Sequence, residues 1–169
     1  MQITRYASLT EQQFLGCTSA FVDVLSGELN SAVMYLRKLE NQPKGAAFAY
    51  EMTLDRHRYG ALTVLDRWSA LAAAFAPHLK LGRYQAIIDE AAMRVRQSEG
   101  ILGRANELID ASDHYSSAVV EACTLAFQAL STTFAEERKA AEQSEKLGPM
   151  LTDDYKQARS VFMQDLTAR

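Results

Sequence analysis

The sequence contains few residues that break helices or cross-link a chain. Its 169 residues include three prolines, eight glycines and two cysteines. A chain of this length buries about 70% of the surface that its unfolded form exposes, so its core needs neither a disulfide nor a metal. The scarcity of proline favours long helices, because proline interrupts them.

The sequence also lacks a positive net charge, a long apolar run and a secretory signal. The net charge of −3 argues against nucleic-acid binding, which usually needs a positive field. No 18 consecutive residues are apolar, so we predict no membrane span. The first ten residues contain one arginine and no apolar stretch, unlike a signal peptide. We therefore expect a cytoplasmic protein.

Four junctions divide the chain into segments with the apolar period of helices. Three contain the prolines, Pro43, Pro77 and Pro149, and the fourth is 110–113, whose Ser and Asp residues are good helix caps. Short connections between long helices favour antiparallel neighbours. We predict an all-α fold, an antiparallel up-down four-helix bundle with a short fifth helix. One domain spans 1–169, with an N-terminal arm at 1–9 and an appended C-terminal helix at 150–169.

The apolar positions predict which face of each helix is buried. Steps of three and four residues are typical of helices that pack almost parallel. In the second segment this pattern selects Phe48, Met52, Tyr59, Leu65 and Trp68 as the buried face. Asp55 falls on the same face. A buried carboxylate needs a partner, and Arg58 or Arg104 would provide one.

A layer of polar residues at similar predicted height suggests a site inside the bundle. At about 1.5 Å per residue, five charged or titratable side chains fall in one layer: Glu28, Asp55, His57, Glu99 and Glu121. The candidate polar site consists of Glu28, Asp55, His57 and Glu121. Di-iron bundles require Glu-x-x-His motifs, and the sequence has none. We therefore predict no metal and no cofactor. An enzyme, or a ligand or metal carrier, with a polar site near Asp55 is kept as the alternative function.

The two cysteines and two glycines have simpler interpretations. Cys17 and Cys123 fall roughly 20 Å apart in height, too far for a disulfide, and we expect both to be buried free thiols. Gly100 and Gly103 interrupt the third helix. We interpret them as a site of close helix packing or a kink rather than a hinge.

In the absence of converging catalytic groups, we predict a non-enzymatic protein-interaction module. An adaptor, a chaperone or an inhibitor or immunity-type protein would fit. The predicted surface combines basic residues of the second helix with the apolar face of the last: Arg56, Arg58, Arg67, Tyr155, Phe162 and Leu166. The partner is expected to be another protein of unknown identity. A homodimer formed through Ala-rich helix faces is the third hypothesis.

Overall fold

The computed structural model describes residues 11–75, 83–144 and 153–168. Within these ranges the chain forms five α-helices and no strands, which confirms the predicted all-α class. The helices are α1 (Glu11–Leu39), α2 (Phe48–Phe75), α3 (Arg83–Ala111), α4 (Ser117–Ser144) and α5 (Asp153–Thr167). The N-terminal arm at 1–9 and the junctions at Pro77 and Pro149, all predicted from the sequence, lie outside the described residues.

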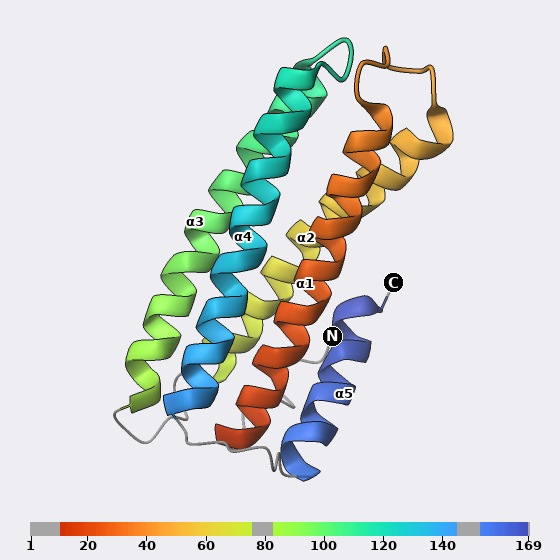
Figure 1. Cartoon of the computed structure of the whole chain (residues 1–169). Coiled ribbons are helices and arrows are strands. Elements are labelled where there is room, and N and C mark those ends of the chain that lie inside the picture. The colour runs from red at the N-terminus through yellow and green to blue at the C-terminus, as the bar shows by residue number, and fades with distance from the viewer. Residues whose placement is uncertain (1–10, 76–82, 145–152, 169) are drawn as a thin grey trace.

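The four long helices lie side by side and alternate in direction, and α5 lies beside the lower half of α1 (Figure 1). Helix α1 packs against α2, α4 and α5, whereas α3 packs against α2 and α4. Helix α5 runs in the same direction as α1 in Figure 1. The fifth helix is therefore an addition to the outer face of α1 and does not enter the centre of the bundle.

Aromatic side chains fill the lower half of the core, where α5 meets the bundle. The ring of Phe21 stacks on Trp68 with centroids 4.7 Å apart and meets the edge of Phe134 at 5.1 Å. Phe162 of α5 lies 6.3 Å from the same tryptophan. Such aromatic pairs add stabilisation beyond the area they bury. Trp68 therefore connects α1, α2 and α5 in one cluster.

The apolar face of α5 is packed within the chain, so it does not form the exposed partner surface predicted from the sequence. Tyr155, Phe162 and Leu166 are all buried. The guanidinium of Arg67 donates hydrogen bonds to the carbonyl oxygens of Asp165 and Leu166, at 2.8 and 2.7 Å. It thereby satisfies carbonyl groups that the end of a helix leaves unpaired. The guanidinium of Arg67 is thus also engaged inside the molecule.

Backbone hydrogen bonds join the two loops at the upper end of the bundle. Asn41, with φ of 66°, lies just beyond the end of α1, and its N–H donates to the carbonyl of Tyr115 at 2.7 Å. The N–H of Tyr115 donates in turn to the carbonyl of Gln42 at 2.9 Å. These loops contain the junctions predicted at Pro43 and at 110–113. Their pairing holds the beginning of α2 next to the end of α3.

Two further predictions can be compared with the structure. Cys17 and Cys123 are buried and form no disulfide, as predicted, and burial raises the pKa of the Cys123 thiol to about 11. The interpretation of Gly103 as a close-packing site was wrong, because a Cβ added there meets nothing within 4 Å. A Cβ at Gly100 would meet only the end of the Arg104 side chain, at 3.8 Å. Helix α3 continues through both glycines.

Helix α4 is rich in apolar residues, and some of them are exposed. By length and composition, its stretch Ser117–Glu136 could cross a membrane, although the core helices of soluble proteins pass the same test. A third of this stretch is buried. Leu125 is 61% exposed. Leu125 therefore lies on an outward face of α4 that the described residues leave exposed.

Candidate functional site

In the upper half of α2, the buried face differs from the one predicted from the sequence. Along the whole helix, the buried positions include Leu54, Arg58, Ala61, Leu65 and Trp68, which follow one another in steps of four and three. Because one of these core positions is an arginine, the apolar pattern of the sequence pointed to a different face of the helix. The buried face predicted for the first turns of α2 was therefore wrong.

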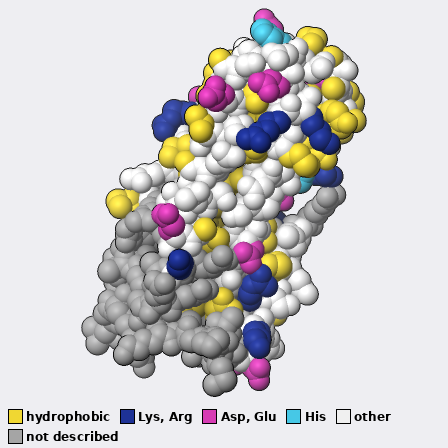
Figure 2. Space-filling view, in the orientation of Figure 1, with side chains coloured by type: hydrophobic (Ala, Val, Ile, Leu, Met, Phe, Trp, Pro, Cys, Tyr) yellow, Lys and Arg dark blue, Asp and Glu magenta, His cyan; other side chains and the backbone are white. Residues whose placement is uncertain are grey.

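As a result, three large side chains predicted to be buried lie on the surface. Phe48 is 69% exposed, Met52 56% and Tyr59 47%. Figure 2 shows hydrophobic side chains gathered at the upper end of the molecule, over the beginning of α2. We call Phe48, Met52 and Tyr59, with the neighbouring carboxylates Asp55 and Asp110, the apical surface.

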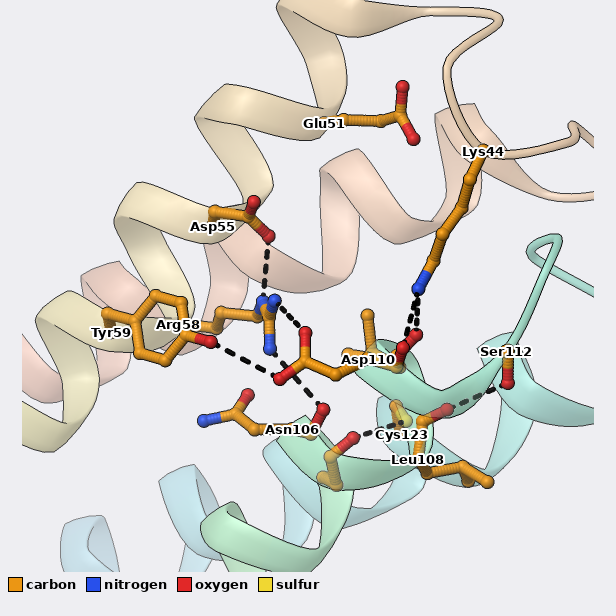
Figure 3. Close-up of polar contacts among 12 residues, drawn as sticks. Lys44, Glu51, Asp55, Arg58, Tyr59, Asn106, Leu108, Asp110, Ser112 and Cys123 are labelled. Atoms are coloured by element: carbon orange, nitrogen blue, oxygen red, sulfur yellow. Dashed lines mark hydrogen bonds and ion pairs between the residues drawn. The ribbon is translucent and has the colours of Figure 1, made fainter.

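Arg58 is buried beneath this surface and binds two carboxylates (Figure 3). It is 3% exposed. Its Nε donates to Asp55 Oδ1 at 2.9 Å, and its Nη2 donates to Asp110 Oδ1 at 2.5 Å. Its Nη1 donates to the carbonyl of Asn106 at 3.4 Å. The predicted partnership of Asp55 and Arg58 is confirmed, but the arginine is the buried member and the carboxylate is half-exposed.

Arg58 and Asp110 each favour the charged form of the other. The hydrogen bond from Arg58 lowers the pKa of Asp110, and this effect outweighs the opposing effect of burial. Burial lowers the pKa of Arg58, but the hydrogen bonds and charges of Asp110 and Asp55 outweigh it, so this pKa is raised. The phenol of Tyr59 donates to Asp110 Oδ2 at 3.3 Å. Helices α2 and α3 are thereby joined by charged groups.

Replacement of Asp110 by Asn should make stability less dependent on acid pH. Because the pKa of Asp110 is lowered in the folded protein, ionised Asp110 stabilises the fold above the unfolded pKa of about 3.9. That contribution is lost as the pH falls through the lowered value. The wild type should therefore exceed Asp110→Asn in stability at pH 7, and the difference should shrink below about pH 4.

Urea denaturation between pH 3 and pH 7 measures this difference. Glu107→Gln, an exposed position on the same helix, removes one negative charge without touching Arg58 and is the matched control. A gap between wild type and Asp110→Asn that is the same at every pH would contradict the assignment.

Lys44 and Glu51 hold the loop before α2 in place. The ammonium group of Lys44 donates to the carbonyl oxygens of Ile109 and, at 3.2 Å, of Asp110, at the C-terminal end of α3. A cation there also interacts favourably with the helix dipole. Glu51 accepts from the N–H of Gly45 at 3.0 Å and from the hydroxyl of Tyr115 at 3.1 Å. Burial, and then Glu51, raise the pKa of that tyrosine, so it remains a donor.

A pocket of about 250 Å³ opens between these groups. Its wall combines apolar side chains, carboxylates and the two engaged cations, and includes Lys44, Gly45, Phe48, Glu51, Met52, Asp55, Arg58, Ile109, Asp110 and Tyr115. The side chains of Asp55 and Asp110 are 49% and 52% exposed. The pocket therefore presents carboxylate oxygens to solvent beside an apolar edge.

The other residues of the predicted polar layer do not join this pocket. His57 Nδ1 lies 2.8 Å from Glu28 Oε2, on the side of α2 that faces α1. A Cβ at Gly60 would lie 2.8 Å from the same carboxylate, so that glycine leaves space for it. Glu121 is exposed on α4. Among the described residues, no group of three His, Cys, Asp or Glu side chains is placed to hold a metal.

The structure also separates the three arginines predicted to form a basic surface. Arg58 is buried and paired, and Arg67 binds the end of α5. Of these three residues, Arg56 on α2 is the one that is exposed.

Comparison with protein-family models, with curated proteins and with solved structures finds no match for this chain.

Proposed function

We propose that this protein is a non-enzymatic protein-interaction module that binds its partner through the apical surface. The observation that carries the proposal is the exposure of Phe48, Met52 and Tyr59 on one face of α2. Single exposed apolar residues are common on soluble proteins. Here Phe48 and Met52 form part of one pocket wall, and Tyr59 binds the carboxylate of Asp110 beside it. Apolar surface that surrounds a pocket is typical of binding sites.

The apical surface is held rigidly, which favours binding. Lys44 and Glu51 fix the loop on one side, and Arg58 joins α2 to α3 below it. A surface that is ordered before binding loses less conformational entropy when a partner arrives. Exposed tyrosine and phenylalanine also provide large contact areas with few rotatable bonds. An adaptor, a chaperone or an inhibitor or immunity-type protein, acting in the cytoplasm, fits these properties.

The alternative of a bundle enzyme or a carrier has less support. Its proposed residues belong to separate groups, since His57 on α2 pairs with Glu28 on α1, whereas Asp55 binds Arg58 and lines the pocket. Asp55 is already bound to Arg58 through one oxygen. An ion pair of this kind fits a structural role better than that of a catalytic acid.

Self-association through α4 is a second candidate. Four exposed positions follow one another in steps of four, three and four residues on its outward face: Ala118, Ala122, Leu125 and Ala129. Small side chains at this spacing allow a second helix to pack closely. A closed dimer would place the same stripe of both copies at its interface.

Native mass spectrometry of protein isolated gently from its own cells tests the proposal. We expect a discrete complex with another protein for the wild type and at least a tenfold loss of that complex for Met52→Glu, because a charge would be buried in the interface. Leu125→Glu is the matched control, since it adds the same charge at an exposed apolar position of α4. If Leu125→Glu abolishes the complex and Met52→Glu does not, the apical surface is not the binding site. A species of twice the chain mass that Leu125→Glu removes would support the dimer.

A further inference from the structure

In the pocket beside the apical surface, the cationic groups already have hydrogen-bond partners within the chain, whereas the carboxylates can accept further hydrogen bonds. The inference drawn from this difference rests on the function proposed above. The two cations of the pocket are engaged inside the molecule. Arg58 donates through Nε, Nη1 and Nη2 to Asp55, Asn106 and Asp110. Lys44 donates to two backbone carbonyl oxygens of α3. Both cations therefore already have oxygen partners within the chain.

The carboxylates, in contrast, keep free capacity to accept hydrogen bonds. A carboxylate has two oxygens with about four lone-pair sites. Asp55 uses Oδ1 for Arg58, and Asp110 accepts from Arg58 and Tyr59. Both side chains are about half-exposed, so their remaining lone pairs face solvent. Together with Glu51, the pocket contains three carboxylates and two cations, which leaves an excess of negative charge.

The apolar edge of the pocket lies beside these carboxylates. Phe48 and Met52 line the pocket together with Asp55 and Asp110. Lysine and arginine side chains have apolar stems and cationic ends, and they bury the stem along apolar surface while the charge binds a polar group. Arg56 is exposed on the same helix and does not line the pocket.

We propose that the pocket accepts a lysine or arginine side chain of the partner protein. In the partner, this basic residue is flanked by apolar residues. The stem of that side chain lies along Phe48 and Met52, and its cationic group binds Asp55 and Asp110. An acidic side chain would instead meet exposed carboxylates of the same sign. The partner surface is therefore basic and apolar, complementary to the apical surface.

A selection with random peptides tests this inference without knowledge of the partner. The probe is a phage-displayed library of 16-residue peptides, selected on the wild-type chain and counter-selected on Met52→Glu. We expect the enriched peptides to share a lysine or arginine flanked by apolar residues. Replacing that basic residue by methionine in a synthetic peptide should weaken binding to the wild type at least tenfold. Added salt should weaken the parent peptide and have less effect on the methionine peptide.

A variant of the protein provides the second measurement. Asp55→Asn combined with Asp110→Asn removes both charges but keeps an acceptor oxygen for Arg58, and its fold is checked by circular dichroism. The parent peptide should bind this variant at least tenfold more weakly. If the variant is unfolded, the methionine peptide on wild-type protein still decides the question.

Each other outcome has a distinct meaning. Peptides that depend on Met52 but lack a basic residue, or that tolerate its replacement, would overturn this inference and leave the proposed function standing. If no enriched peptide is sensitive to Met52→Glu, both this inference and the proposed function are wrong.

Discussion

Replacing both carboxylates beside Arg58 should destabilise the protein much more than replacing Arg58 itself. The double variant Asp55→Ala/Asp110→Ala leaves a guanidinium group that is 3% exposed without a charged partner. A buried charge left unpaired in this way costs about 3–5 kcal/mol. Arg58→Met leaves two carboxylates that are about half-exposed and can be hydrated, and its loss should be about 1 kcal/mol.

Urea unfolding at pH 7 measures both free energies. The control is Glu107→Ala/Asp113→Ala, which removes two exposed carboxylates near the same end of the bundle. Its stability should stay within about 0.5 kcal/mol of the wild type. If Arg58→Met lowered the free energy of unfolding more than the double carboxylate variant does, the two carboxylates would not be compensating the cost of burying the Arg58 charge.

Gly16→Ala should weaken the docking of α5, whereas Gly27→Ala should stabilise the protein. A Cβ at Gly16 would lie 2.3 Å from the carbonyl oxygen of Tyr155, so the backbone of α5 has to move. Overpacking of this kind costs about 1–3 kcal/mol. A Cβ at Gly27, on the same helix, meets nothing within 4 Å. There the higher helix propensity of alanine should contribute about 1 kcal/mol.

The single tryptophan reports on this docking, because Trp68 lies 6.3 Å from Phe162 of α5. Its fluorescence should shift in Gly16→Ala and stay unchanged in Gly27→Ala, while urea unfolding gives the two stabilities. Unchanged fluorescence and wild-type stability in Gly16→Ala would show that α5 does not approach α1 this closely.

The class of fold was predictable because most helices keep one apolar period along their length. In α3, Ser98, Leu102, Ala105 and Ile109 follow one another in steps of four and three, and all are buried. The loops around Pro43 and 110–113 were predictable from proline and from capping residues, whose backbone preferences act locally. The buried face of α2 was not predictable in this way, since Arg58 occupies a core position there.

The candidate site depends on information that an apolar pattern does not contain. Lys44 binds a carbonyl oxygen 66 residues away in the sequence, at Asp110. Asp55 and His57 were predicted to lie in one layer from their rough height along the bundle. Residues two positions apart in a helix, however, point in directions that differ by about 200° around its axis. Asp55 therefore lines the pocket beside Ile109 and Asp110 of α3, whereas His57 pairs with Glu28 of α1.

Photo-cross-linking in the native cells tests most directly whether the apical surface binds another protein. Benzoylphenylalanine is introduced at position 52, which is 56% exposed at the edge of the pocket, or at position 161 on α5 as the control. We expect a covalent adduct with a distinct protein from position 52 and none from position 161. An adduct from position 161 alone, or no adduct from position 52 in cells where the protein is folded and abundant, would contradict it.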